Sequence, residues 1–210
     1  MKPARAIIDA CRELQRRGLN QGTAGNVSVR SAGGFLITPT GKAYDSMKPA
    51  DIVALDREGG IVGKGRPSSE WRLHRDVYSR RPEVGAVVHT HSGFATTLAC
   101  LREKIPAVHY MMAFFGGDDI RCSGYATYGT QELSDRVLKA LDGRKAALMG
   151  SHGLIVLGRD LAEALALTIE AENLAMLYWR TLQVRRPVVL PEAEISRVRE
   201  KALKSGYGKG

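Results

Sequence analysis

The sequence predicts an α/β fold in which helices cover a mixed sheet. Segments with the periodicity of amphipathic helices alternate along the chain with short apolar runs bounded by turn residues. This intermixing is typical of a sheet that carries helices against its faces. The 210 residues are enough to bury a full core, and no repeat, low-complexity tract or interdomain linker divides them. We therefore expect one domain over residues 1–210, with a mobile tail at about 205–210.

The first part of the chain predicts one helix and three strands. The opening segment MKPARAIIDACRELQRRG has apolar side chains at helical spacing, with Arg and Glu opposite them, and it ends near Gly18. A polar loop, NQGTAGN, leads into the runs VSVR and FLIT, which the turn SAGG joins as a hairpin. A further strand is expected over IVALD, followed by the turn REGG.

Helices dominate the rest of the chain. One should begin around Ser68 and Ser69, because serine favours the N-cap position, and should reach about Arg80. The strand GAVVH follows, and helices are then expected over SGFATTLACL, TQELSDRVLKALDG and DLAEALALTIEAENLAMLYWRTL. Between the last two helices, AALM and LIVL form a strand pair around GSHG. Pro191 is suited to open a final helix.

Composition narrows the classes of partner. The chain carries 31 Lys+Arg and 22 Asp+Glu, a net charge of +9, which suits nucleic acid, anionic membranes or phosphorylated small molecules equally. It has no zinc-finger or RNP-like pattern, no GxxxxGK[ST] loop, and no apolar run near the roughly 18 residues of a membrane span. We therefore expect a cytoplasmic protein that binds neither nucleic acid nor membrane. Three cysteines without CxxC spacing, expected to be reduced and mostly buried, are Cys11, Cys100 and Cys122.

The stretch AVVHTHSGF at 86–94 places two histidines at the end of an apolar strand. Alternate residues of a strand face the same way, about 6.6 Å apart, so His89 and His91 can reach one ion. Taken alone, the pair fits two surface histidines equally well. A third histidine, His152, lies between small residues at a strand junction, and three neutral imidazoles leave a zinc ion one open position. We expect packed or hydrogen-bonded roles for His74 and His109.

Seven motifs carry a resemblance to a known family. In chain order they are GTAGNVSVR, LITPTG, PSSEWRLH, VVHTH, IPAVHYM, YATYGT and SHGLIV. With their approximate spacing, over roughly residues 5–185, they resemble the class II aldolase/adducin family, and most closely its L-fuculose-1-phosphate aldolase branch. The resemblance implies a three-layer α/β/α fold around a mixed, mostly antiparallel sheet. It also implies a ring-like homotetramer with active sites between neighbouring subunits.

The resemblance also implies a set of site residues. It makes His89, His91 and His152 the ligands of one Zn²⁺ per subunit, or of another divalent metal. Glu70 matches the catalytic acid/base, and Tyr110 matches a tyrosine that reaches into the neighbouring subunit's site and handles the proton on the C4 oxygen. The residues that match the phosphate-binding positions are Asn26, Thr40, Gly41, Ser68 and Ser69, with Gly25 beside them.

The implied reaction is the reversible cleavage of a ketose 1-phosphate, such as L-fuculose 1-phosphate, between C3 and C4. The products are dihydroxyacetone phosphate and an aldehyde such as L-lactaldehyde. In this chemistry a metal ion stabilises the negative charge left after cleavage, and Glu70 protonates C3. A Schiff-base mechanism would need a buried lysine, and no lysine lies inside an apolar strand here.

Alternatives remain open at this point. Related aldolases take 5-deoxyribulose 1-phosphate or 5-methylthioribulose 1-phosphate, which share the groups that the identified residues bind. L-Ribulose-5-phosphate 4-epimerases resemble this pattern with aspartate at the position of Glu70, and the adducin branch is a non-catalytic interaction module. Two tyrosines depart from the family pattern or have uncertain register: Tyr128 stands where phenylalanine is usual, and Tyr207 lies near the position of a mobile C-terminal tyrosine.

Overall fold

The computed structural model describes residues 3–206 and contains helices and strands intermixed along the chain. Over these residues the helices are α1 (Pro3–Arg16), α2 (Trp71–Arg80), α3 (Gly93–Leu101), α4 (Gln131–Ala140), α5 (Leu161–Val184) and α6 (Glu192–Ser205), with three 3-10 turns, η1 (Tyr44–Ser46), η2 (Pro49–Asp51) and η3 (Tyr110–Phe115). The strands described are β1 (Asn26–Ser31), β2 (Gly34–Ile37), β3 (Val53–Asp56), β4 (Ile61–Val62), β5 (Ala86–Thr90), β6 (Ile105–Pro106), β7 (Asp119–Cys122), β8 (Ala146–Met149) and β9 (Gly153–Gly158).

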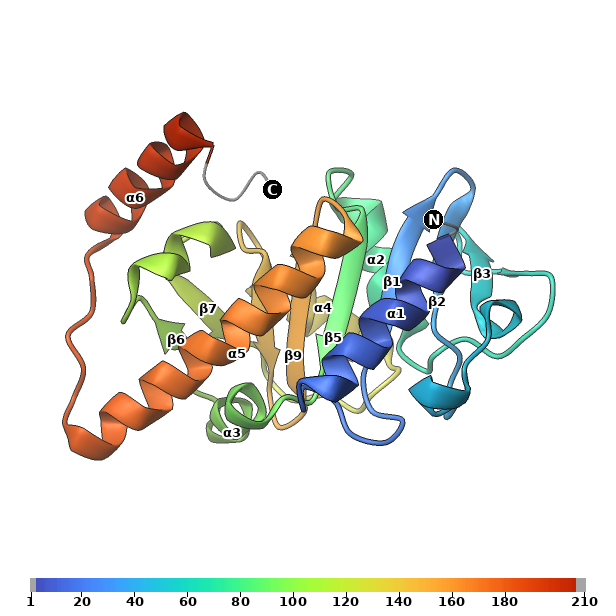
Figure 1. Ribbon diagram of the computed structural model, residues 1–210, viewed down its shortest axis with the longest axis horizontal. Helices are drawn as coiled ribbons and strands as arrows, with labels where there is room; N and C mark the ends of the chain where they lie inside the picture. Colours follow the sequence, from blue (N-terminus) through green and yellow to red (C-terminus); the bar gives the residue numbers. More distant parts are fainter. Residues whose placement is uncertain (1–2, 207–210) are drawn as a thin grey trace.

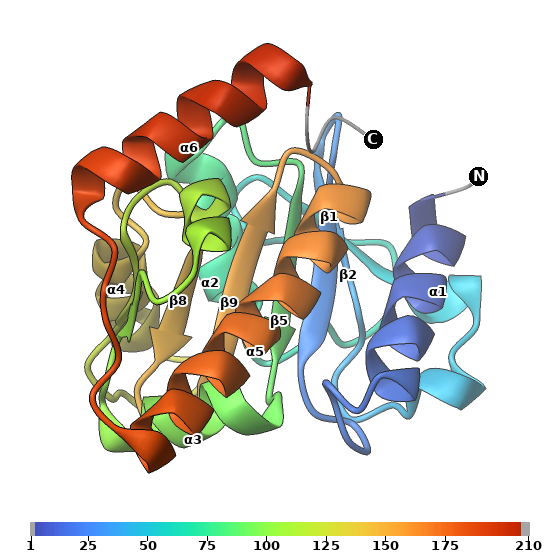
Figure 2. The same ribbon diagram turned by 60° about the vertical axis from the view of Figure 1, so that its left-hand side comes forward.

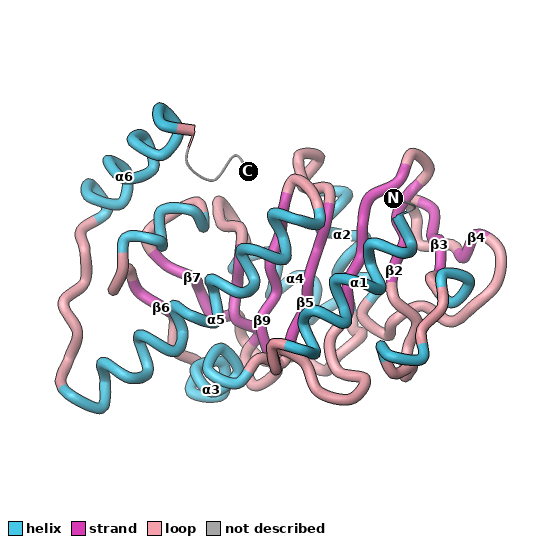
Figure 3. Tube along the Cα trace, in the orientation of Figure 1, coloured by secondary structure: helices cyan, strands magenta, loops and turns pink. Residues whose placement is uncertain are grey.

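Within residues 3–206 these strands form one sheet in the order β4-β3-β2-β1-β5-β9-β8-β7-β6 (Figure 3). The neighbouring pairs are antiparallel, except that β7 runs parallel to β8. The sheet is therefore mixed and mostly antiparallel, as the family resemblance implies. The hairpin of β1 and β2 and the strand pair of β8 and β9 are both confirmed. Strand β5 lies in the middle of this sheet, between β1 and β9.

Helices cover both faces of the sheet, so the structure has three layers (Figures 1 and 2). Helices α1, α3 and α5 lie on one face, and α2 and α4 lie on the other. Successive residues of β5 alternate between these layers: Val87 packs in the cluster that contains α2 and α4, whereas Val88 packs with α1. His89 shares the face of Val87, which directs its side chain to the layer of α2.

Local sequence explains the first helix, but the predicted start of α2 is wrong. The first helix is amphipathic as predicted and buries Ile7, Ile8, Cys11 and Leu14. Helix α2 begins at Trp71, later than the serine pair predicts, and its N-cap residue is Glu70. The serines instead belong to the segment before the helix, where the Ser68 backbone N–H is 2.9 Å from the carbonyl oxygen of Thr38.

The C-terminal helix α6 packs over η3 beyond one end of the sheet (Figure 2), with Pro191 as its N-cap residue. The first two residues of the tail predicted at about 205–210 belong instead to this helix, since Ser205 lies in α6 and Gly206 is its C-cap residue. The remainder of the tail, residues 207–210 with Tyr207, lies outside the described residues. Among residues 3–206 no helix combines the length and apolar character that crossing a bilayer requires.

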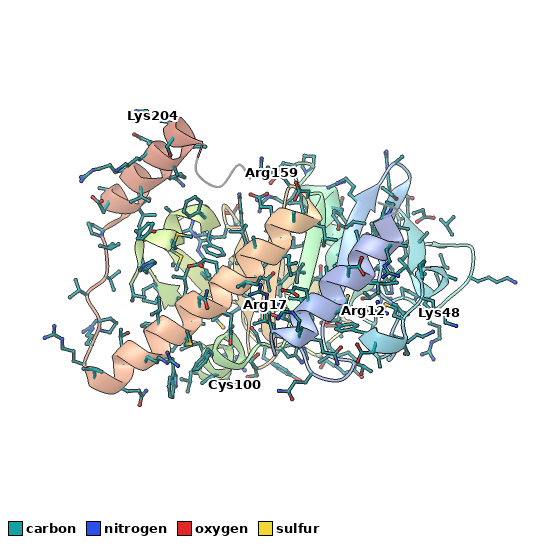
Figure 4. The ribbon with its side chains drawn as sticks, in the orientation of Figure 1. Arg12, Arg17, Lys48, Cys100, Arg159 and Lys204 are labelled. Atoms are coloured by element: carbon teal, nitrogen blue, oxygen red, sulfur yellow. The ribbon has the colours of Figure 1, made fainter. Side chains whose placement is uncertain are left out.

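The expectation of mostly buried cysteines is wrong. All three are free, but only Cys11 is buried, Cys122 is half-buried and Cys100 is exposed on α3 (Figure 4). An apolar helix such as α3 still has an outward side, and Cys100 lies on it. Basic side chains are spread along the molecule in the same view, where the labelled ones are Arg12, Arg17, Lys48, Arg159 and Lys204.

Candidate active site

Three histidines converge at one end of the central strands. His89 is the fourth residue of β5, His91 follows the end of that strand, and His152 lies in the turn between β8 and β9. Their rings stand edge to face, with centroids 4.8–5.0 Å apart. One nitrogen from each ring lies within 4.8 Å of the others. Three imidazoles in this arrangement can bind a single metal ion.

The turn that carries His152 brings its ring close to the other two. Ser151 has a positive φ of 54° and donates its backbone N–H to the carbonyl of Ala99 in α3, 2.9 Å away. Gly153 follows, and a Cβ atom on it would overlap the carbonyl of Thr90 and press on the rings of His89 and His91. The absence of a side chain at Gly153 therefore lets β9 approach the histidine pair closely.

The orientation and charge of the histidines suit metal binding. The Nδ1 atom of His89 is 2.9 Å from the carbonyl oxygen of Leu154, so Nδ1 carries a proton and donates it. Burial opposes a charge on His89, but Glu70, whose Oε2 lies 3.1 Å from Nε2, raises the pKa of His89. Nε2 therefore carries a proton toward Glu70, and a metal ion bound at Nε2 would replace that proton. Burial lowers the pKa of His91 to about 4 and the pKa of His152 to about 4, so both rings are neutral at pH 7.

Glu70 lies against this group from the start of α2. Its Oε2 atom is 3.1 Å from His89 Nε2 and accepts a hydrogen bond of 2.9 Å from the Asn26 side-chain amide. Its Oε1 atom lies 3.5 Å from His152 Nε2 and has no hydrogen-bond partner among the described residues. Burial opposes ionisation of this carboxyl, but His89 and Asn26 outweigh it and hold the pKa of Glu70 well below its usual range. Glu70 is therefore a buried, ionised carboxylate.

A cavity of about 340 Å³ opens beside Glu70, and its walls include His91 and His152. Residues from six separate segments line it. These are the loops on either side of the β1–β2 hairpin, the segment before α2, the residue after β5, the loop between β7 and α4, and the turn between β8 and β9. They include every residue that the family resemblance assigns to phosphate: Gly25, Asn26, Thr40, Gly41, Ser68 and Ser69.

Hydrogen bonding within the protein limits which of these groups are available. The backbone N–H of Ser68 donates to the Thr38 carbonyl, and the backbone N–H of Thr40 donates to the Arg66 carbonyl, so neither is available to a ligand. Within residues 3–206, the backbone N–H groups of Gly41 and Ser69 have no such acceptor. Among the residues that the structure describes, no lysine or arginine lines the cavity. An anion in this part of the cavity would therefore be bound by neutral hydrogen-bond donors and by the nearby N-terminus of α2.

The predicted tyrosines lie in different places. Tyr128 lines the cavity, although 65% of it is exposed. Tyr110 is the first residue of η3, is 45% exposed, and is not among the residues that line the cavity. His109 caps η3 by accepting a hydrogen bond from the Met111 N–H, so its predicted hydrogen-bonded role is confirmed. One chain alone does not bring Tyr110 to the cavity wall.

Comparison with known proteins identifies the family. Residues 5–179 match the family model described as Class II Aldolase and Adducin N-terminal domain. The chain belongs to this family. The class II aldolases are metal-dependent, and here the three histidines form the group suited to hold the ion.

Individual relatives of this class II aldolase have two kinds of name. A 5-methylthioribulose-1-phosphate/5-deoxyribulose-1-phosphate aldolase of Rhodospirillum rubrum is 54% identical, over 93% of this chain and 88% of its own length. An L-fuculose phosphate aldolase of Escherichia coli strain K12 is 51% identical, over 95% of this chain and 94% of its own length. A solved structure of an L-fuculose 1-phosphate aldolase superposes with a TM-score of 0.92 and 39% identity, covering 95% of each chain.

The residues of this class II aldolase fit a bound metal ion on structural grounds. Three ring nitrogens face one point, and His89 Nδ1 is already committed to a backbone carbonyl. A buried carboxylate oxygen without a partner, Oε1 of Glu70, also lies at this group. Neutral nitrogen donors in this number are the ligand set of catalytic zinc sites.

Sequence reasoning missed the residues that support the site from behind. Asn20 is buried, and its side-chain oxygen accepts the backbone N–H of His91 at 2.9 Å. His74 is fully buried and bonds to Asn26 and Ser28, which confirms its predicted hydrogen-bonded role but also connects it to Glu70. The four-residue spacing of Glu70 and His74 within the α2 segment was the signal that could have indicated this connection.

Proposed function

We propose that this class II aldolase is a zinc-dependent enzyme that reversibly cleaves a ketose 1-phosphate between C3 and C4. The products are dihydroxyacetone phosphate and an aldehyde. The observation that carries this proposal is one cavity whose lining includes His91, His152 and Glu70 together with Thr40, Gly41 and Ser69. A substrate with a phosphate at one end and a reactive carbonyl near it suits these two sets of residues.

The proposed reaction divides into binding and proton transfer. During cleavage the C3–C4 bond breaks, its electron pair stays on C3, the C4 hydroxyl loses its proton as the aldehyde forms, and C3 takes up a proton. A divalent ion held by His89, His91 and His152 supplies Lewis-acid stabilisation of the negative charge that develops on the ketose, an effect of several kcal/mol. In the condensation direction the Glu70 carboxylate removes a proton from C3 at Oε1. In cleavage Oε1 first takes up one proton, equivalent to the proton that the C4 hydroxyl releases, and delivers it to C3.

The two oxygens of Glu70 are suited to different tasks. Oε2 is held by Asn26 and His89, whereas Oε1 has no hydrogen-bond partner among residues 3–206. A catalytic base needs one oxygen free to take the proton and a fixed position for the carboxylate as a whole. We therefore assign proton transfer to Oε1.

The phosphate is proposed to bind at the loops that carry Gly25, Thr40, Gly41, Ser68 and Ser69. The backbone N–H groups of Gly41 and Ser69 are available there, together with the Ser69 and Thr40 hydroxyls. These groups are neutral donors, and the N-terminus of α2 adds the positive end of its dipole. Binding of the phosphate places the carbonyl end of the ketose toward the histidines.

Tyr110 is proposed to act in the active site of a neighbouring subunit of a homotetramer, at the C4 oxygen. Support comes from its exposure and from its position outside the cavity of its own chain. An exposed tyrosine on a short 3-10 turn is well placed to enter a partner's site.

The aldehyde portion separates two classes of candidate substrate. L-Fuculose 1-phosphate would give L-lactaldehyde, whereas 5-deoxyribulose 1-phosphate or its methylthio analogue would give acetaldehyde or methylthioacetaldehyde. The second class is favoured by the name of the Rhodospirillum rubrum relative at 54% identity. Release of dihydroxyacetone phosphate from each of the three ketoses, with and without a chelator, tests the proposal. Chelator-sensitive release from one of them supports it, and absence of release from all three by zinc-loaded protein contradicts it.

A further inference from the structure

A buried chain of hydrogen bonds runs behind Glu70, between α2 and β1. Asn26 connects Glu70 to His74, since its side-chain nitrogen is 2.9 Å from Glu70 Oε2 and its oxygen is 2.5 Å from His74 Nε2. The other ring nitrogen of His74 is 2.6 Å from the Ser28 hydroxyl, which is 2.7 Å from the hydroxyl of Tyr78. His74 and Ser28 are 0% exposed, Asn26 is 3% and Tyr78 is 7% exposed.

This series of hydrogen bonds forms because four residues of a helix and two residues of a strand cover nearly the same distance. Four residues of a helix rise about 6.0 Å, and two residues of a strand span about 6.6 Å. Glu70, His74 and Tyr78 are spaced by four along the α2 segment, while Asn26 and Ser28 are spaced by two along β1. The side chains of the two elements therefore interleave, and each β1 side chain bridges two from the α2 segment.

The orientation of the Asn26 amide sets the direction of every bond. Its NH₂ group lies 2.9 Å from Glu70 Oε2, and its oxygen lies 2.5 Å from His74 Nε2. An amide oxygen only accepts hydrogen bonds. His74 Nε2 must then carry the proton, which leaves Nδ1 as the acceptor for the Ser28 hydroxyl. The Ser28 oxygen in turn accepts from the Tyr78 hydroxyl. Each group donates toward Glu70.

We infer that His74 and Asn26 are positioning residues, which fix Glu70 through Oε2 so that Oε1 points to the reacting carbon. The inference deepens the proposed function and rests on it for the role of Glu70. It also gives Asn26 a different role from the phosphate contact expected from the family resemblance. The side-chain amide of Asn26 belongs first to the carboxylate, and the phosphate is left to Thr40, Gly41 and Ser69.

This series of hydrogen bonds orients Glu70 and does not conduct protons to it. A proton path needs groups that both take up and release a proton, and the amide of Asn26 does neither readily. His74 is fully buried, and this burial lowers its pKa to about 3, in keeping with a ring that stays neutral at pH 7. A neutral ring with a fixed tautomer is what orientation of an amide requires.

The first test is the tautomer of His74, read from its ring ¹⁵N chemical shifts in the wild-type protein, both metal-free and zinc-loaded. We expect the Nε2–H tautomer, neutral from pH 6 to 8, in both forms. The Nδ1–H tautomer or a charged ring in this range overturns the inference. Since this readout needs no turnover, it decides the direction of the hydrogen bonds even if the ketose phosphates tested above are not cleaved.

The second test compares His74→Phe with His74→Gln in zinc-loaded protein. Glutamine can place an N–H near the position of His74 Nε2, whereas phenylalanine cannot. Because outer-shell partners of active-site groups typically contribute roughly 10–100-fold, His74→Phe should lower kcat by that amount with little change in KM, and His74→Gln should recover most of it. Equal losses in the two variants contradict the inference. If His74→Phe does not fold, Ser28→Ala removes the donor to Nδ1 and should lower kcat in the same way, and an unchanged kcat contradicts it.

A third comparison separates residues that hold Glu70 from residues that bind the phosphate. Asn26→Ala should lower kcat and leave KM for the ketose phosphate nearly unchanged, because its amide holds Glu70. Thr40→Val is the matched control, since Thr40 lines the same cavity and is not among the described polar partners of Glu70, and it should raise KM. A raised KM with normal kcat in Asn26→Ala would return Asn26 to the phosphate. Failure of wild-type protein to release dihydroxyacetone phosphate instead counts against the proposed function, and the tautomer result then stands by itself.

Discussion

Asn26 of β1 and His89 of β5 lie directly opposite one another on neighbouring antiparallel strands. Residues paired in this way present their side chains on the same face of the sheet. The register therefore places the amide that holds Glu70 beside one of the proposed metal ligands, and α2 lies over both. A shift of one residue in this pairing would send one of the two side chains to the opposite layer.

Removal of one histidine should remove the metal. Outer-shell partners of metal ligands already contribute roughly 10–100-fold to affinity, so His91→Ala should weaken zinc binding by at least that factor. Competition with a chromophoric chelator measures the affinity. The control is His109→Ala, which removes a histidine from η3, away from the group formed by His89, His91 and His152. Unchanged zinc affinity in His91→Ala would show that the ligands are assigned wrongly.

Replacement of Glu70 by glutamine should stop proton exchange more than metal binding. Glu70→Gln keeps the shape of the side chain and can still bond to Asn26, but it cannot take a proton from C3. We expect exchange of the C3 proton of dihydroxyacetone phosphate with solvent to fall by about 10²–10⁴-fold, measured by deuterium incorporation. Zinc affinity, measured in parallel, should change much less. Exchange at the wild-type rate would rule out Glu70 as the base.

A methyl group at Gly153 should disturb both folding and the metal site. The added Cβ would overlap the Thr90 carbonyl and press on the rings of His89 and His91. Overpacking of this kind costs about 1–3 kcal/mol, so Gly153→Ala should lower the free energy of unfolding by that amount and weaken zinc binding. Gly33→Ala is the control, since nothing lies within 4 Å of its added Cβ. Equal stability of the two variants in denaturant unfolding would contradict this explanation.

Asp119 should make stability depend on pH in the acid range. Burial opposes its ionisation, but hydrogen bonds from Lys104 and Arg144 hold the pKa of Asp119 below its usual value. Its contribution is complete above the unfolded-state pKa of about 3.9 and is lost as pH falls through the lower folded-state value. Asp119→Asn should therefore cost about 1–3 kcal/mol at pH 7, and the difference from wild type should shrink below pH 4.

The neighbouring carboxylate provides the control for this measurement. Asp118 also pairs with Arg144, but its side chain is 39% exposed, whereas that of Asp119 is 10% exposed. An exposed pair contributes at most about 1 kcal/mol, so Asp118→Asn should have a small effect at either pH. Urea unfolding of both variants and wild type from pH 2.5 to 7 measures these differences. If Asp119→Asn lowered the free energy of unfolding by the same amount at every pH, the ion pairs of Asp119 would not be the source of the loss.

The parts of the fold that follow from local pattern could be predicted from the sequence. The spacing of Ile7, Ile8, Cys11 and Leu14 defines α1, and the two-residue period of a strand places His89 and His91 together. Strands β6 and β7 were missed because β6 has two residues and β7 carries Asp119 and an arginine, so neither has an apolar run. Their strand character comes from pairing with neighbours, which tertiary structure decides.

The candidate site was predictable only where motifs carried it. The position of His152 between small residues at a strand junction linked it to the histidine pair, and the family resemblance implied that it is a ligand. The structure brings the three rings together. The contact of His74 with Asn26 joins residues 48 positions apart, so no local pattern contains it. It depends on how α2 lies against β1, as does the free Oε1 of Glu70. Long-range packing therefore determined the supporting groups that sequence reasoning missed.

Tyr110 and Glu70 should act together only across a subunit boundary. Glu70 borders the cavity, whereas Tyr110 is exposed and lies outside the cavity lining of the same chain. We expect Tyr110→Phe and Glu70→Gln each to impair cleavage when assembled alone. If the two variants mix at random in equal amounts in the proposed homotetramer, about a quarter of the sites combine an intact Glu70 with an intact Tyr110 from the neighbour.

Coexpression of the two variants with different affinity tags, followed by purification through both tags, gives the mixed oligomer for this experiment. Its cleavage rate should exceed the mean of the two single-variant proteins and approach a quarter of the wild-type rate per site, because complete sites form only where the two variants meet. A mixed oligomer no more active than that mean would place Tyr110 in the site of its own chain or outside the reaction. Since Tyr110→Phe removes only a hydroxyl from an exposed side chain, loss of folding is not expected to obscure the result.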